Sequence, residues 1–193
     1  MRLFTLAVTS LTGIQSSLMP DPRFSLICLA LASALLAGVP GTDARAAAAG
    51  DAAPGFSIPD ARGAAVSLEA LRGKVVYLDF WASWCGPCRR SFPWMNELVQ
   101  RYAAQGLAVI AVNVDKKAAD ANQFLQQNPA RFTVLYDPAG AAPLAYGVKG
   151  MPSSYLIDRE GKVVRVEAGF FDEHKPAIEE AVRALLQKRK SDS

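Results

Sequence analysis

The amino-acid sequence predicts an α/β fold in which a mixed central sheet is covered by helices on both faces. Two nearly continuous apolar runs, residues 74–82 and 107–114, are typical of strands that are buried on both sides. A helical pattern follows each run, which indicates that these strands are parallel. Two further strand patterns near residue 160 are joined by a hairpin signal, so the sheet should also contain an antiparallel part.

The elements around the first apolar run can be assigned from turn residues and periodicity. Residues 56–58 and 65–67 fit a short hairpin, and residues 68–71 fit a helical turn. The helix that follows the first buried strand is expected at about residues 85–104. Pro93 falls inside this helix, where it removes a backbone hydrogen bond and should kink the helix.

The remaining elements come after the second apolar run. The turn between the last two strands is signalled by Asp-Arg-Glu-Gly at residues 158–161. In chain order we expect a helix at 118–128, a strand at 132–136, a helical turn at 143–146, strands at 154–157 and 163–166, and a last helix at 175–188.

The N-terminal part of the chain differs in kind from the rest. Residues 24–39 are apolar and uncharged, Arg23 precedes them, and Ala-Arg-Ala at 44–46 places small residues where a signal peptidase reads them. The apolar run is long for a secretory signal and short for a membrane span. Residues 1–46 are therefore interpreted as a signal peptide cleaved near residue 46, or as a retained membrane anchor.

The rest of the chain is divided by composition. Residues 47–54 are rich in alanine and glycine and have no hydrophobic period, so we expect a linker. Residues 55–190 should form one domain, and residues 191–193 a short tail. The leader is unusually long, so translation starts at Met1 or at Met19.

Charge excludes one class of partner. The formal net charge is +3, and the basic residues are scattered apart from a short run at 188–190. A nucleic-acid-binding surface gathers its basic residues on one face or along one helix. We therefore expect no nucleic-acid partner.

A cysteine pair, Cys85 and Cys88, lies where the first buried strand meets the start of a helix. The unpaired N–H groups and partial positive charge at a helix start favour an anion, so Cys85 should ionise more readily than a free thiol. The thiolate is the nucleophile in disulfide exchange. This position predicts a redox site.

Metal-binding and structural roles for the pair have weaker support. Zinc needs about four ligands, and the only other candidates of the usual kind are Cys28, in the apolar run, and His174. An iron–sulfur cluster meets the same shortage. A structural disulfide would close a very short loop and restrict the unfolded chain little. No metal site is expected.

Two separated motifs resemble the thioredoxin superfamily. The first is Asp-Phe-Trp-Ala-Ser-Trp-Cys-Gly-Pro-Cys at residues 79–88, followed by Pro93, and the second is Gly-Val-Lys-Gly-Met-Pro-Ser-Ser-Tyr-Leu-Ile-Asp at residues 147–158. The exported N-terminus and the hairpin before the first strand are similar to the TlpA/ResA-like branch. The resemblance covers residues 53–188 and implies a thioredoxin-like fold with an N-terminal hairpin and an inserted helix and strand at about 118–136.

The first motif implies roles for the cysteines and their neighbours. By resemblance, Cys85 is the exposed nucleophile that attacks a substrate disulfide, and Cys88 is the resolving cysteine that releases the product from the mixed disulfide. Trp84 would cover the disulfide and form an apolar contact surface. Gly86 and Pro87 would complete the substrate-binding surface, with the proline favouring a reducing pair.

The second motif and a buried acid complete the predicted site. The resemblance implies a cis peptide bond before Pro152, beside the active site, and a Met151 backbone that pairs with an extended substrate. Asp79 lies in the middle of an apolar strand, where a carboxylate is costly to bury without a partner or a task. It matches the buried acid of thioredoxins, which accepts a proton from the resolving thiol Cys88.

One position departs from the pattern of the exported branch. Many members place a glutamate after the strand that follows the cysteine helix, and Lys116 occupies the matching position here. This departure weighs against the specialised mechanism of the apo-cytochrome reductases and favours a more thioredoxin-like one.

Together these features predict an exported thiol:disulfide oxidoreductase that reduces protein disulfides in the periplasm or another extracytoplasmic compartment. Dithiol–disulfide exchange needs no cofactor. The resemblance implies a membrane-embedded electron donor of the DsbD/CcdA type and a connection to cytochrome c maturation, and leaves the substrate open. We expect a monomer.

Two rival functions remain at this point. The same two thiols would suit a metal carrier such as a copper chaperone. A peroxidase of the peroxiredoxin group would need a Pro-x-x-x-Thr/Ser-x-x-Cys site, which this chain lacks.

Overall fold

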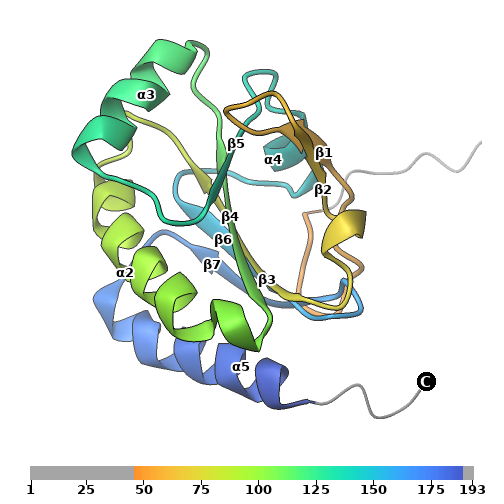
Figure 1. The fold of residues 1–193 in the computed structure, drawn as a ribbon. Coiled ribbons are helices and arrows are strands. Elements are labelled where there is room, and N and C mark those ends of the chain that lie inside the picture. The colour runs from red at the N-terminus through yellow and green to blue at the C-terminus, as the bar shows by residue number, and fades with distance from the viewer. Residues whose placement is uncertain (1–45, 189–193) are drawn as a thin grey trace, which may run out of the picture. The chain divides into compact units, whose positions relative to one another are not determined.

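The computed structural model describes residues 46–188, which belong to one compact unit. A five-stranded mixed sheet with the order β5-β4-β3-β6-β7 forms its centre (Figure 1). Strands β3, β4 and β5 are parallel, and β6 and β7 are antiparallel to their neighbours, as the sequence predicts. The strands span β3 Val75–Trp81, β4 Leu107–Asn113, β5 Thr133–Tyr136, β6 Ser153–Ile157 and β7 Val163–Ala168.

Helices cover both faces of this sheet. Helices α2 and α5 lie side by side on one face in Figure 1, where Arg101 of α2 makes an ion pair with Glu179 of α5. The opposite face is covered by α4 and by the β1–β2 hairpin. The bounds are α2 Gly86–Tyr102, α3 Ala118–Gln127, α4 Ala141–Ala145, α5 Lys175–Gln187, β1 Ser57–Pro59 and β2 Ala65–Ser67, with 3-10 turns η1 Glu69–Leu71, η2 Ala103–Gln105 and η3 Asp172–His174.

Strand β3 divides the core into two apolar clusters because successive side chains point to opposite faces. Tyr77 and Trp81 belong to the cluster on the side of α2, α3 and α5. Leu78 and Phe80 belong to the cluster beneath α4 and the hairpin. Every residue of β3 is buried, which fits the uninterrupted apolar run.

Helix α2 connects the core to the site that the sequence predicts. Cys85 is its N-cap residue, and a proline stands in its first turn, where the missing N–H would have no partner within the helix. Pro93 lies inside the helix, as expected, on its exposed side. The segment after α2 closes at Gly106, whose φ of 102° lies in the left-handed region that glycine adopts readily.

The predicted linker, residues 47–54, is hydrogen bonded to the domain. The Gly50 N–H donates to the Val163 carbonyl at 2.8 Å, and the Ala53 N–H donates to the Gly161 carbonyl at 2.9 Å. Ala47 is buried against the cluster beneath α4. Backbone hydrogen bonds do not require a periodic pattern of side chains. Composition alone therefore predicts a linker, although this segment lies against the edge of the sheet.

Some predictions fall outside the described residues. These are the signal peptide or anchor at 1–46, apart from its last residue, Cys28 within it, and the tail at 191–193. Within residues 46–188, no helix combines the length and the apolar character that crossing a membrane requires.

Candidate functional site

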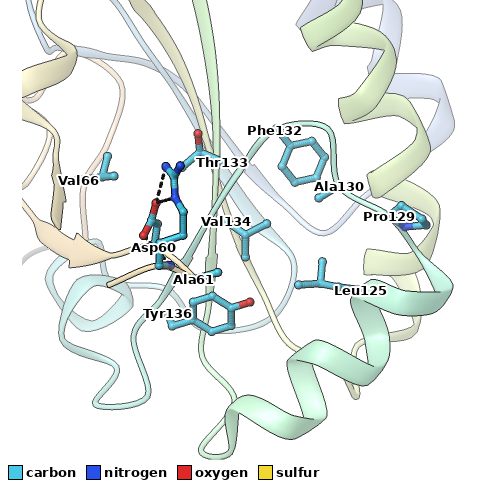
Figure 2. Close-up of a pocket in the computed structure, with 11 residues that line it drawn as sticks. Asp60, Ala61, Val66, Leu125, Pro129, Ala130, Phe132, Thr133, Val134 and Tyr136 are labelled. Atoms are coloured by element: carbon cyan, nitrogen blue, oxygen red, sulfur yellow. Dashed lines mark hydrogen bonds and ion pairs between the residues drawn. The ribbon is translucent and has the colours of Figure 1, made fainter. Parts of the chain in front are cut away.

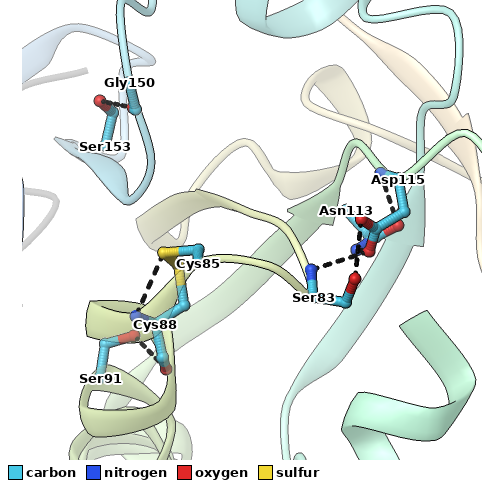
Figure 3. Close-up of a disulfide and its surroundings, with 8 residues drawn as sticks. All are labelled: Ser83, Cys85, Cys88, Ser91, Asn113, Asp115, Gly150 and Ser153. Atoms are coloured by element: carbon cyan, nitrogen blue, oxygen red, sulfur yellow. Dashed lines mark hydrogen bonds between the residues drawn. A yellow bond between two sulfur atoms is a disulfide. The ribbon is translucent and has the colours of Figure 1, made fainter. Parts of the chain in front are cut away.

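Cys85 and Cys88 form a disulfide at the N-terminus of α2, with their Cα atoms 5.4 Å apart (Figure 3). The Cys88 N–H donates to the Cys85 Sγ at 3.2 Å, so the sulfur caps the helix as a serine hydroxyl would. A thiolate at this sulfur would be stabilised by the same N–H and by the helix dipole. The local structure therefore favours the ionised form of Cys85.

The two sulfur-bearing residues differ little in exposure in this oxidised form. Cys88 is completely buried, and Cys85 is 3% exposed. Cys85, which the family pattern implies is an exposed nucleophile, is therefore less exposed than expected. It is still the more accessible of the two cysteines. Gly86 and Pro87 are exposed in the first turn of α2, and Trp84, just before the pair, is 69% exposed.

Trp81 and Trp84 lie three residues apart but have opposite environments. Trp81 is fully buried and packs against the rings of Phe92 and Phe124, with centroid distances of 4.9 and 4.8 Å. Trp84 makes no aromatic pair with another described residue and presents its indole to solvent. Trp81 is thus a core residue, and Trp84 is available as a contact surface beside the disulfide.

The peptide bond between Met151 and Pro152 is cis, as the resemblance implies. The loop is tied on both sides: the Gly169 N–H donates to the Pro152 carbonyl at 2.8 Å, and the Ser153 hydroxyl donates to the Gly150 carbonyl at 2.8 Å (Figure 3). Met151 packs against the apolar cluster that contains both cysteines. The fold therefore brings the second motif to the disulfide.

Asp79 is buried at 1% exposure, and its position in β3 directs it to the face that α2 covers. Cys88 lies on the same face. The Asp79 Oδ2 atom has no hydrogen-bond partner among the described residues. Burial raises the pKa of this carboxyl well above its ordinary value, because the charged form would lose its hydration.

A pair of hydroxyl groups near Asp79 was not apparent from the sequence. Ser154 lies directly opposite Asp79 in the pairing of β3 with β6. The Tyr77 hydroxyl donates to the Ser154 Oγ at 2.8 Å. Burial, and then the negative charge of Asp79, raise the pKa of Tyr77, so its phenol stays protonated and acts as a donor. Only the side-by-side pairing of the strands reveals this cluster.

Asp115 is a second feature that sequence reasoning missed. Its carboxylate accepts hydrogen bonds from the Ser83 N–H at 2.9 Å and the Ser83 hydroxyl at 3.0 Å (Figure 3). The Asn113 side-chain amide donates to the same carboxylate at 2.8 Å. These bonds hold the loop before Cys85 against the end of β4. Asp115 was visible only as a polar residue after a buried strand.

Lys116 and His174 are accounted for by local contacts. The Lys116 Nζ donates to the Pro138 carbonyl at 2.6 Å, on the exposed side of the chain. The His174 Nδ1 lies 2.9 Å from the Glu167 Oε2, as a partner of that carboxylate. Among residues 46–188, no group of three or more histidine, cysteine or acidic side chains is arranged to hold a metal ion.

The structure also contains a groove that lies away from the disulfide. Figure 2 shows this groove, of about 590 Å³, between the β1–β2 turn at Asp60 and the side chains of α3 and β5. The Arg62 guanidinium pairs with the Asp60 carboxylate at its rim. Neither cysteine lines this groove, so it is separate from the redox site.

The fold and the site together define a class, the thioredoxin-fold proteins that exchange thiols and disulfides through a cysteine pair at a helix start. Residues 48–185 match the Redoxin family, and the chain belongs to it. Among curated proteins it resembles the thiol-disulfide oxidoreductase ResA of Bacillus thuringiensis subsp. konkukian, with 35% identity over 136 residues, which covers 70% of this chain and 78% of the relative. ResA of Geobacillus thermodenitrificans is 38% identical over 128 residues, 66% of this chain and 74% of the relative.

Solved structures agree with this assignment. A crystal structure from Chlorobium tepidum, described as a thiol:disulfide interchange protein DsbE, is 54% identical to this chain with a TM-score of 0.71. It covers 73% of this chain and 99% of the solved one. The protein is therefore a thiol:disulfide oxidoreductase with a thioredoxin-like fold.

Proposed function

We propose that this protein is exported and acts as a reductant of protein disulfides, with Cys85 as the nucleophile, Cys88 as the resolving thiol and Asp79 as the proton acceptor. The observation that carries the proposal is the buried Asp79 carboxyl, whose Oδ2 has no hydrogen-bond partner within residues 46–188, on the same sheet face as Cys88. A group that lacks a permanent partner is free to take up and release a proton in each cycle.

The first step is attack by the Cys85 thiolate on one sulfur of the substrate disulfide. A bond forms between that sulfur and Sγ of Cys85, the substrate S–S bond breaks, and the other substrate sulfur leaves as a thiolate that takes a proton from water. The Cys88 N–H, at 3.2 Å from Sγ in the oxidised form, supports the thiolate before attack. The Met151 backbone, just before Pro152, would pair with the extended substrate.

The second step resolves the mixed disulfide. The Cys88 thiol gives its proton to the Asp79 carboxylate, directly or through water, and the resulting thiolate attacks Sγ of Cys85. The enzyme disulfide forms, and the second substrate sulfur leaves as a thiolate that is then protonated. Two electrons pass from the enzyme dithiol to the substrate. A base with a raised pKa suits this task near neutral pH because it holds the proton more firmly than an ordinary carboxylate.

Turnover requires a dithiol donor that reduces the Cys85–Cys88 disulfide. We propose a membrane-embedded donor of the DsbD/CcdA type, with this protein acting as a monomer in the periplasm or another extracytoplasmic space. Support comes from the apolar run at 24–39 and from the similarity to ResA and DsbE proteins. Apoproteins of cytochrome c are one substrate class that this similarity favours.

The direction of electron flow is tested by trapping thiols in cells with an alkylating reagent that adds mass. A mostly reduced Cys85–Cys88 pair is expected for a reductase. A fully oxidised pair would overturn the reductant role and indicate an oxidase.

A matched test uses Cys85→Ser with purified protein. The variant should lose at least about 1,000-fold in insulin reduction, because the nucleophile of covalent catalysis is removed. Two further measurements on the wild type separate the rival functions. Tight one-to-one copper binding that Cys85→Ser abolishes would make metal carriage the main role, and rapid turnover of hydrogen peroxide would favour a peroxidase.

A further inference from the structure

A polar cleft of about 340 Å³ opens beside Trp84, between the first turn of α2 and the outer side of α3. It is at the small end of the size range of ligand pockets. Trp84 belongs to the first motif, whereas the α3 side of the cleft is used neither by the mechanism above nor by the motifs. The lining side chains are Ser83, Trp84, Arg89, Asp120, Gln123, Phe124 and Gln127.

Both walls of the cleft are held in place. Ser83 is fixed by its two hydrogen bonds to Asp115. On the other wall, Phe124 anchors α3 in the core, where its ring lies 4.8 Å from Trp81 and 5.0 Å from Phe92. The fold therefore fixes the two walls of the cleft at Ser83 and at Phe124.

Unlike Ser83, four polar side chains that line the cleft have no partner among residues 46–188. Within residues 46–188, the side chains of Arg89, Asp120, Gln123 and Gln127 make no hydrogen bond or ion pair with one another or with any other residue. Gln123 and Gln127 stand one helical turn apart, so they present their amides along the same side of α3. Donors and acceptors of both charge signs thus face one small space.

The topology places this cleft across the disulfide from the cis-proline loop. Cys85 follows β3, Asp115 follows its neighbour β4, and Pro152 precedes β6 on the other side of β3. Figure 3 shows the disulfide between the Gly150–Ser153 loop and the Ser83–Asp115 network. An extended chain that crosses Cys85 from Pro152 would continue towards the cleft.

We propose that this cleft binds the polypeptide segment of the substrate on the far side of its cysteine from Pro152, and that it selects polar, uncharged side chains there. Amides and hydroxyls can use the donors of Arg89 and the glutamines together with the acceptor Asp120, whereas an apolar side chain would leave these groups unpaired. The inference rests on the proposed disulfide reductase function and adds specificity to it.

The test compares Gln123→Ala/Gln127→Ala with Gln126→Ala. Gln126 is a matched control because it is exposed on the same helix but does not line the cleft. The probes are two synthetic peptides of equal length with one intramolecular disulfide, flanked by serine and asparagine in one and by leucine and valine in the other. Hydroxyethyl disulfide serves as a small substrate that cannot reach the cleft while it reacts.

The wild type should prefer the polar peptide, and the double variant should lose about 10-fold in kcat/KM for it, mainly through KM, as expected for two hydrogen bonds. Gln126→Ala should keep the wild-type kcat/KM for both peptides. With hydroxyethyl disulfide, the wild type and both variants should react at the same rate. Equal losses with the small disulfide, or a wild type without preference, would overturn the cleft inference alone. A wild type that reduces neither peptides nor the small disulfide would overturn the proposed function itself.

Discussion

The two faces of β3 have the same burial but different chemistry. On the face beneath α4, Leu78 and Phe80 pack into a cluster of apolar and aromatic side chains. On the α2 face, Asp79 stands between Tyr77 and Trp81, and its Oδ2 atom has no hydrogen-bond partner in the described part of the chain. The first face stabilises the fold, whereas the second holds the buried carboxyl that we propose as the proton acceptor. A single strand thus separates stability from reactivity.

Shortening Leu78 gives the largest expected effect on stability. Leu78→Ala should lower the free energy of unfolding by about 2–5 kcal/mol, because it leaves a cavity in a fully buried cluster. The milder Ile110→Val, in the same cluster, should cost about 0.5–1.5 kcal/mol. Chemical denaturation measures both. Insulin reduction per folded molecule should be unchanged, and a slower rate would show that the two faces are not independent.

Replacing the buried acid should affect the rate instead. Asp79→Asn should slow resolution of the mixed disulfide by about 100-fold, because a general base is removed. Single-turnover release of the second product thiol measures this step, while the first step should keep its rate. Loss of the first step instead would remove Asp79 from the role of proton acceptor.

The raised pKa of Asp79 also makes stability depend on pH. The folded protein holds this proton above the unfolded value of 3.8, so the contribution of Asp79 to stability is complete below that pH and is lost as pH rises through its folded pKa. Relative to Asp79→Asn, the oxidised wild type should therefore lose stability as pH rises above about 4. A constant difference between the two proteins would contradict the raised pKa.

A tyrosine on each face gives the smallest and most specific comparison. Tyr77→Phe removes the hydrogen bond to Ser154 and should cost about 1 kcal/mol. Tyr146, in the cluster beneath α4, has a buried hydroxyl that no other described residue contacts by a hydrogen bond, so Tyr146→Phe should be neutral or slightly stabilising. Thermal unfolding at one pH measures both. If both variants lost the same stability, the hydrogen bond between Tyr77 and Ser154 would make no contribution of its own.

The sequence predicted the parts of the molecule that depend on neighbours along the chain. A few neighbouring residues are enough to recognise the apolar run of β3, the helix start at Cys85 and the carboxylate of Asp79 within an apolar strand. The Ser83–Asp115 and Tyr77–Ser154 contacts join residues 32 and 77 positions apart, so they depend on which strands pair. The contacts of the segment at 47–54 were not predicted, because the backbone makes them and carries no residue pattern.

Because Cys88 is completely buried, Cys85 is the only accessible sulfur of the disulfide. In the proposed cycle, an incoming thiol would reach only Sγ of Cys85, so the proposed donor would use the same access route as the substrate. The two partners therefore exclude each other and take turns. Steady-state kinetics with both present should give parallel double-reciprocal lines, the pattern of a shuttle that visits one partner and then the other.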